Sequence, residues 1–300
     1  MCFSVMIATL LDADKYPALQ TARQLVEAGR YSVYSIHQRD PRLLSSVRIQ
    51  EEPPMLETRD LTKVYDNTIL AVNKLNLKVE RGEIYVVLGA NGAGKSTAIA
   101  MLLNFIDPTS GTAFVNEIEI PRFPLDAKKH LAYVSENVEL YRNFTARQNL
   151  EFFAKLGGRK KVTQAELDEA LARVGLPEDS FKRRVKTFSK GMRQRLGIAI
   201  AIMKQADVVL LDEPTSGLDP KGGADFLNLL RELRAEGKAI FMSTHDIFRA
   251  KEIADRLGIL VEGNLVLELT REEIENEDLE ALYIRYVAGY SQENETAAVA

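Results

Sequence analysis

The stretch from Gly89 to Thr97 has the residue types and order of a phosphate-binding loop. Glycines at 89, 92 and 94 allow the backbone to curl, so that successive N–H groups converge on phosphate oxygens. Lys95 is placed to reach the β- and γ-phosphates, and the Ser96 hydroxyl can bind Mg²⁺, a hard cation that takes oxygen ligands. We predict that this loop holds a nucleoside triphosphate through Gly89, Asn91, Gly92, Ala93, Gly94, Lys95, Ser96 and Thr97.

Two carboxylates follow an apolar run further along the chain. The run Val208 to Leu211 is expected to be a buried strand, and Asp212 and Glu213 come directly after it. Carboxylates at the end of a buried strand are costly unless something positive lies nearby, and Mg²⁺ beside a triphosphate supplies that charge. We predict that Asp212 helps to hold the ion and that Glu213 is a general base for a water molecule.

The elements that must position these residues follow an alternating pattern of strands and helices. Apolar residues at 72, 75, 77 and 79, then Ile84 to Leu88, predict a half-buried strand followed by a fully buried one. Strand, glycine loop and helix in succession is the context that a P-loop requires. The sequence therefore predicts an α/β fold with a sheet core.

The segment after Tyr141 is different, because its pattern is helical. Thr145 and Thr163 each begin a capping box, and glycines at 157, 158 and 175 are typical helix ends. Strands resume at Val208 and at Ala239, a tight turn is expected at residues 262–264, and Thr270 begins a last helix. We therefore predict a helical subdomain over about residues 137–190, inserted in the α/β core.

Composition limits the class of protein. The 300 residues are 46 % hydrophobic and 27 % charged, which is typical of a globular chain. The net charge of −4 gives no reason to expect nucleic-acid binding. A single cysteine, Cys2, cannot form an internal disulfide and favours a reducing, cytoplasmic compartment. The apolar run at the N-terminus is too short for a membrane span.

Three units of organisation are expected along the chain. Residues 1–54 form an N-terminal extension of unknown role, and an alternative interpretation is that translation starts at Met55. Residues 55–269 contain all the motifs, and residues 270–300 form a C-terminal helix and an acidic tail, which is expected to fray after Gly289.

Three further motifs identify a family. They are the segment Thr187 to Arg195, the segment Ser216 to Asp219, and Ser243-Thr244-His245-Asp246. With the P-loop and the paired carboxylates, they resemble the ATP-binding subunit of ABC (ATP-binding cassette) transporters, in the family's order and without a coiled-coil insertion. The resemblance covers roughly residues 55–269. It implies the cassette type of P-loop NTPase fold, with a mixed sheet core and an inserted helical subdomain, and Mg-dependent hydrolysis of ATP.

The resemblance also implies a head-to-tail dimer of two cassettes, either identical or different. In such a dimer, ATP bound to the P-loop of one subunit is covered by the signature segment of the other. Ser189 and Gly191 correspond to the signature serine and its second glycine, at a helix N-terminus that can meet the γ-phosphate. Asp219 corresponds to the aspartate that links the two sites.

Two more residues gain a role from the resemblance. His245 corresponds to the histidine that contacts the γ-phosphate and orients Glu213 and the attacking water. Tyr65 lies where the family has an aromatic residue that stacks on adenine. The alternative for Tyr65 is a strand-edge side chain that packs on its neighbours.

The sequence departs from the family pattern at two positions. The signature, usually Leu-Ser-Gly-Gly-Gln, here has Lys190 in place of its first glycine and Met192 in place of its glutamine. Lys190 is expected either to face the triphosphate or to be solvated. Glu136 stands where the family commonly has a glutamine that contacts Mg²⁺; a carboxylate can also bind the ion, although it adds negative charge beside phosphates.

The resemblance implies a peripheral subunit on the cytoplasmic face of the membrane, which powers transport through separately encoded integral membrane permease subunits. An exporter is favoured over a sugar importer, because importer subunits often carry an extra C-terminal β-domain and only about 30 residues follow Leu269. One alternative is a soluble single-cassette ATPase that acts on ribosomes or on an assembly machinery. Another is a regulatory nucleotide binder with a degenerate signature.

Overall fold

The computed structural model describes residues 53–287, and all statements below concern this part of the chain. Most of the predicted N-terminal extension and the end of the acidic tail lie outside the described residues. Met55 is buried, and its backbone N–H donates to the carbonyl of Val79 at 2.9 Å, so the first strand is anchored from its start.

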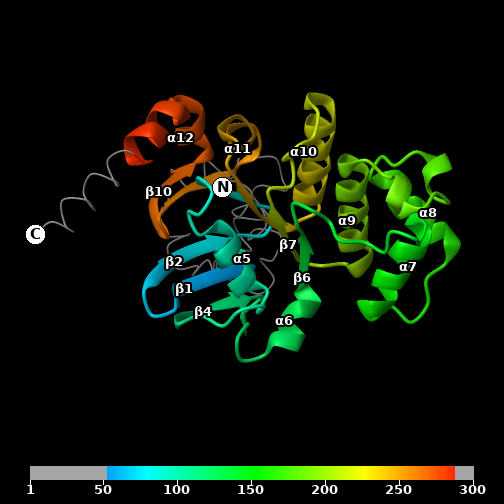
Figure 1. Cartoon of the computed structure of the whole chain (residues 1–300), viewed down its shortest axis with the longest axis horizontal. Helices are drawn as coiled ribbons and strands as arrows, with labels where there is room; N and C mark the ends of the chain where they lie inside the picture. The colour runs from blue at the N-terminus through cyan, green and yellow to red at the C-terminus, as the bar shows by residue number, and fades with distance from the viewer. Residues whose placement is uncertain (1–52, 288–300) are drawn as a thin grey trace, which may run out of the picture. The chain divides into compact units, whose positions relative to one another are not determined.

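The larger of two sheets carries the core of the molecule (Figure 1). Its six strands lie in the order β10-β9-β3-β8-β7-β6, and only the β9–β10 pair is antiparallel. Short apolar runs form the four inner strands because both faces of a parallel sheet are covered. The strands are β3 (Ile84–Leu88), β6 (Leu131–Val134), β7 (Val208–Asp212), β8 (Ala239–Thr244), β9 (Arg256–Val261) and β10 (Asn264–Thr270).

The smaller sheet is antiparallel, with strand order β2-β1-β4-β5. Its strands alternate buried and exposed residues, as in β2, where Val72, Leu75, Leu77 and Val79 face inward. The prediction of a mixed sheet core is confirmed, and the strands of that core divide into two sheets, which the sequence did not indicate. The bounds are β1 (Leu56–Tyr65), β2 (Ile69–Val79), β4 (Ser110–Val115) and β5 (Ile118–Glu119).

Hydrophobic residues cover both faces of β3. Val86 and Leu88 belong to one buried cluster, whereas Tyr85 and Val87 belong to a second cluster that includes residues of the small sheet. Helix α5 (Lys95–Leu102) adds Ile99 and other apolar residues to this second cluster. The P-loop therefore leads into a helix that is packed between the two sheets. Three more helices complete the α/β core: α6 (Pro124–His130), α10 (Pro220–Ala235) and α11 (Ile247–Ile253).

A helical layer lies beside β6, as Figure 1 shows. It comprises α7 (Ala146–Leu156), α8 (Gln164–Arg173) and two short 3₁₀ turns, η2 (Glu178–Ser180) and η3 (Val185–Thr187). Both predicted capping boxes are present, with Thr145 and Thr163 as N-caps. Helix α9 (Lys190–Lys204) packs against α7, α8 and β6, so the helical layer continues past residue 190 into the core.

The C-terminal part differs from the prediction of one helix. Thr270 caps α12 (Arg271–Asn276) as expected, but this helix is short, and a second helical stretch covers residues 279–287. Asp278 separates the two, because its carboxylate accepts hydrogen bonds from the backbone N–H groups of Glu280 and Ala281, both at 3.1 Å. An N-cap residue has a non-helical backbone, so α12 and the following stretch are separate.

Candidate functional site

The P-loop joins the end of β3 to the start of α5, where sequence analysis expected it. Gly94 has φ +105°, and a Cβ at this residue would lie 2.3 Å from the carbonyl oxygen of Ala71. A Cβ at Gly89 would lie 2.6 Å from the carbonyl oxygen of Leu260. Only glycine fits at these two positions, since the backbone passes closer to its neighbours than any side chain allows.

A distant hairpin supports the loop from behind. Strands β9 and β10 are joined by Glu262 and Gly263, both with positive φ, which confirms the predicted turn. The N–H of Gly263 donates to the carbonyl of Ala93 at 2.9 Å, and its own carbonyl accepts from the N–H of Asn73 at 2.9 Å. The tip of this hairpin thus connects the P-loop to strand β2.

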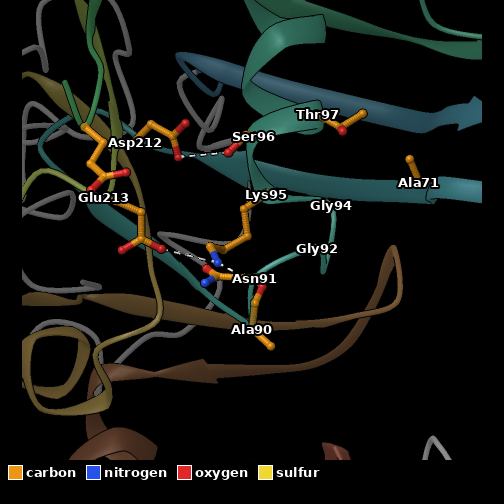
Figure 2. A pocket seen from close by; sticks show the side chains of 11 residues that line it. Ala71, Ala90, Asn91, Gly92, Gly94, Lys95, Ser96, Thr97, Asp212 and Glu213 are labelled. Atoms are coloured by element: carbon orange, nitrogen blue, oxygen red, sulfur yellow. Dashed lines mark hydrogen bonds and ion pairs between the residues drawn. The ribbon is translucent and has the colours of Figure 1, made fainter. Parts of the chain in front are cut away.

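Lys95 lies inside the loop with only 6 % of its side chain exposed. Its Nζ donates to the carbonyls of Gly89 at 2.6 Å and Ala90 at 3.1 Å, and lies 3.3 Å from Glu213 Oε1 (Figure 2). The ammonium is therefore directed into the pocket and paired with the predicted general base. The pocket is lined by Ala71, Ala90, Asn91, Gly92, Gly94, Lys95, Ser96, Thr97, Glu136, Asp212 and Glu213.

Asp212 ends strand β7 beside the first turn of α5. Its Oδ1 accepts hydrogen bonds from Ser96 Oγ at 3.3 Å and from Ser243 Oγ at 2.6 Å. Figure 2 shows the Ser96 and Asp212 side chains directed toward each other across the pocket. A hydroxyl and a carboxylate are the hard oxygen donors that Mg²⁺ prefers, so these residues fit the ion.

Glu213 is held between Lys95 and His245. Its Oε2 lies 2.9 Å from His245 Nδ1, whereas its Oε1 is buried, makes no hydrogen bond and has the Lys95 ion pair as its contact. The backbone of Glu213 has φ +48°, an uncommon conformation for a residue with a Cβ. An uncommon backbone conformation and a buried oxygen without a hydrogen bond are each features found at functional sites.

Glu136 lies on the rim of the same pocket and has partners of its own. Its Oε1 accepts from Lys190 Nζ at 3.1 Å and from Ser216 Oγ at 3.0 Å. The hydrogen bond from Lys190, and then that from Ser216, hold the pKa of Glu136 below its usual value, so the carboxylate is charged. Within the chain, Lys190 thus pairs with Glu136, a partner that the sequence did not predict.

Seven predicted residues lie outside this lining. Gly89 and Ala93 belong to the P-loop itself, and His245 contacts Glu213, which lines the pocket.

The other four predicted residues lie on other elements of the fold. Tyr65 is 37 % exposed, at the end of β1. Ser189 is the N-cap of α9, with its Oγ accepting from the N–H of Met192 at 3.2 Å, and Gly191 is in the first turn of that helix. Asp219 is the N-cap of α10, with its Oδ1 accepting from the N–H of Gly222 at 2.6 Å.

Four contributors were not predicted. Ala90, within the P-loop, lines the pocket and accepts a hydrogen bond from Lys95. Ala71 lines the pocket from β2, and no sequence pattern singles it out. Ser243 lies beside His245 in a motif that was noted, but its hydrogen bonds to Asp212 and to the N–H of Glu213 come from the pairing of β7 with β8. The bond from Ser216 to Glu136 joins segments 80 residues apart, so local pattern gives no signal for it.

Comparison with known proteins places the chain in a family. The family model described as "ABC transporter" matches residues 72–216. The bacitracin transport ATP-binding protein BcrA of Enterococcus faecalis is 40 % identical over 222 residues, which cover 73 % of this chain and 70 % of that protein. The chain belongs to the ATP-binding subunits of ABC transporters.

Two other similar proteins extend this ABC transporter assignment. The lantibiotic transport ATP-binding protein SrtF of Streptococcus pyogenes is 34 % identical, over 76 % of this chain and 96 % of that protein. The ATP-binding cassette MJ0796, solved as a dimer in a post-hydrolysis state bound to ADP and Pi, superposes with a TM-score of 0.66 at 26 % identity, over 72 % of this chain and 99 % of that one.

These findings confirm the predicted family, the cassette fold and the enzyme class. The subunit binds and hydrolyses ATP to power membrane transport. They favour the transporter over the two alternatives considered from the sequence, a ribosome- or assembly-associated ATPase and a degenerate regulatory binder. Among residues 53–287, no helix of this ABC transporter subunit has the length and hydrophobicity to cross a membrane.

Proposed function

We propose that ATP with Mg²⁺ binds in the P-loop pocket and that hydrolysis there drives export. The observation that carries this proposal is the convergence of Lys95, Ser96, Asp212 and Glu213 on one pocket. Backbone N–H groups of the loop and the N-terminus of α5 bind phosphate oxygens, with Lys95 as the cation. Ser96 and Asp212 hold the metal ion, with Glu136 on the rim; when bound, Mg²⁺ neutralises charge on the phosphates.

Nucleotide binding changes the partners of Lys95 and Glu213. In the structure, Lys95 Nζ and Glu213 Oε1 form an ion pair at 3.3 Å, so each charge neutralises the other. A phosphate that takes the Lys95 ammonium leaves Glu213 Oε1 free to accept a hydrogen bond from a water molecule. His245 Nδ1 contacts the other oxygen, Oε2, at 2.9 Å and so orients the carboxylate for the role of general base.

A second cassette completes the site in this proposal. Ser189, Gly191 and Asp219 lie outside the pocket of their own chain, and Ser189 is exposed at the N-terminus of α9. That helix end offers backbone N–H groups and a positive dipole to a phosphate of another subunit. The dimeric state of the related cassette MJ0796 supports this arrangement. Tyr65, exposed at the end of β1, is proposed to stack on the adenine.

The remaining partners are integral membrane permease subunits, with this chain bound at the cytoplasmic face of the membrane. The names of BcrA and SrtF support export and a cargo of the class to which bacitracin and lantibiotics belong, namely peptide antibiotics. Because the permease subunits contact the cargo, this chain would act on it only through them.

Affinity purification from detergent-solubilised source cells tests the transport complex. We expect a protein with several membrane spans to co-purify in roughly equal amount. Deletion of this chain is expected to increase sensitivity to bacitracin or to a lantibiotic, and wild-type protein, but not Glu213→Gln, should restore resistance. Co-purification of ribosomes or of soluble proteins alone would contradict the proposed partners, whereas unchanged sensitivity would contradict only the cargo class.

A further inference from the structure

The Glu136 carboxylate is held by two other segments of the chain. Lys190, the first residue of α9, and Ser216, in the loop after β7, both donate to its Oε1, at 3.1 and 3.0 Å. The aliphatic part of Lys190 runs beside Gly217, where an added Cβ would lie 3.6 Å from its Cδ and Nζ. The side chain of Glu136 is 43 % exposed and that of Lys190 25 %, so the pair borders the pocket without being sealed off.

Helix α9 also holds the backbone at this position. Gln194 is fully buried, and its Nε2 donates to the carbonyls of Ser135 at 3.1 Å and Glu136 at 2.8 Å. Residues 190 and 194 are one helical turn apart and share a face of α9. One face of this helix therefore fixes both the main chain and the carboxylate of Glu136.

The charge of the pocket explains why the Glu136 carboxylate must be held in place. Its lining contains three carboxylates, Glu136, Asp212 and Glu213, and one lysine, Lys95. Asp212 accepts a hydrogen bond from Ser243, and Glu213 contacts His245 and Lys95. A third carboxylate that moved toward bound phosphates would repel them, whereas one that is tied to an ammonium group adds little net charge.

We propose that Lys190 is a positioning residue that acts through Glu136. It holds the carboxylate by Oε1 against α9, so that the carboxylate stays on the rim and does not enter the phosphate site. The two departures from the family pattern, at 136 and at 190, therefore form one functional pair within a single chain. This inference rests on the proposed MgATP site.

The competing role for Lys190 is direct contact with a phosphate in the opposite subunit. That role needs an ammonium free of its own chain, whereas Lys190 Nζ is bound to Glu136 here. The two roles make different predictions. A lysine that acts through Glu136 loses its effect when the carboxylate is removed. A lysine that acts only on the γ-phosphate of the opposite subunit should have the same effect with or without the carboxylate, and no effect when the nucleotide is ADP.

A double-mutant cycle measured by MgADP titration calorimetry tests the inference. MgADP is not consumed and lacks the γ-phosphate that the opposite subunit is expected to contact. We expect Lys190→Met to raise the Kd for MgADP about fivefold, since an untethered carboxylate then lies near phosphates. In a Glu136→Gln background, the same substitution should change the Kd less than twofold. Lys186→Met, an exposed lysine in the same segment, is the control and should not change it.

Each possible outcome decides between the proposals. Equal weakening by Lys190→Met in both backgrounds, or no weakening in either, overturns the positioning role. Absence of MgADP binding in the wild type rejects the proposed nucleotide site and the inference with it. The unfolding temperatures of the four proteins of the cycle, measured without nucleotide, identify any variant that is misfolded. Lys190→Arg keeps a cation and a hydrogen-bond donor at this position. If Lys190→Met is folded, Lys190→Arg should therefore bind MgADP with most of the wild-type affinity.

Discussion

The environment of Glu213 explains how one carboxylate can be restrained before nucleotide binds and active afterwards. Its Oε1 is 3.3 Å from Lys95 Nζ and its Oε2 is 2.9 Å from His245 Nδ1. We expect Glu213→Gln to abolish ATP hydrolysis, because an amide cannot accept the proton of the attacking water. The variant should still bind MgATP and accumulate as an ATP-bound dimer. Phosphate release and size-exclusion chromatography measure the two effects.

Glu232→Gln is the matched control, because Glu232 is an exposed residue on α10. It should hydrolyse ATP at the wild-type rate. An unchanged rate in Glu213→Gln would remove Glu213 as the base.

Tyr65 allows a second test at the residue scale. Its ring is 37 % exposed, and Lys63 Nζ lies 5.3 Å from the ring centroid. If adenine stacks on this ring, Tyr65→Ala should weaken ATP binding about tenfold, since stacking of a base on an aromatic side chain contributes about 1–3 kcal/mol. Tyr65→Phe should recover most of the affinity. Equal affinities for Tyr65→Ala and wild type, from calorimetric titration, would support the alternative of a packing role.

Glu136 gives a third test. We expect Glu136→Gln to keep ATPase activity within about tenfold of the wild type, because this side chain is held on the rim by Lys190 and Ser216 and its negative charge is not needed at the phosphates. A steady-state assay in saturating Mg²⁺ measures the rate. Complete loss of activity would show that the carboxylate itself has a specific role.

Residues of the P-loop could be identified from the sequence because their spacing and the strand before them are local features. The partners of Glu136 could not be, since Lys190 lies 54 residues and Ser216 80 residues further along the chain. The packing of α9 against β6 brings Lys190 to Glu136, and the pairing of β6 with β7 brings the loop that carries Ser216. The same holds for Ser243, which reaches Asp212 because β7 and β8 are paired.

At the scale of elements, the capping box of α8 links stability to pH. The backbone N–H and the hydroxyl of Thr163, and then Arg159, lower the pKa of Glu166 to about 2. Because the folded pKa is below the ordinary value, the charged form stabilises the fold above about pH 4.5, and this contribution is lost as the pH falls toward 2. We expect the Tm difference between wild type and Glu166→Gln to be largest near pH 7 and to shrink by about pH 3.

Glutamine keeps the hydrogen-bonding pattern of a capping box, so this comparison isolates the charge. Glu169→Gln, an exposed position on the same helix, is the control and should show a smaller difference at pH 7. A Tm difference for Glu166→Gln that stays constant from pH 7 to pH 3 would contradict the assignment.

Helices and strands with strong local signals were predicted correctly. Threonine at 145, 163 and 270 caps a helix in each case, and the Glu262-Gly263 turn joins two strands. The division into two sheets was not predicted, because pairing between strands depends on contacts distant in sequence. The break at Asp278 was missed, although aspartate is favoured at a helix N-cap over a helix interior, and its hydrogen bonds to the N–H groups of Glu280 and Ala281 show that it caps a new helix.

At the scale of the whole molecule, assembly can be separated from folding. Ser189 caps α9 through its Oγ, and aspartate caps a helix about as well as serine does. Ser189→Asp should therefore fold normally but place a negative charge where the γ-phosphate of the opposite subunit is expected. In a Glu213→Gln background, we expect it to prevent the MgATP-dependent dimer, as measured by analytical ultracentrifugation.

Ser189→Asn, which keeps a good cap without the charge, is the control and should retain more dimer than Ser189→Asp. If the aspartate variant dimerises as well as its parent while both monomers have the same Tm, then α9 does not face a phosphate across the interface.

The hairpin tip behind the P-loop limits how this protein can be engineered. Surface hairpin tips are usually good sites for peptide tags or for new chain ends in a circular permutant. At Glu262-Gly263 the main chain instead bonds to Ala93 and to Asn73. An epitope inserted at this turn would therefore disturb the P-loop, although the turn lies far from the P-loop in the sequence. Insertion scanning of the gene should therefore show a gap in tolerated sites at this turn.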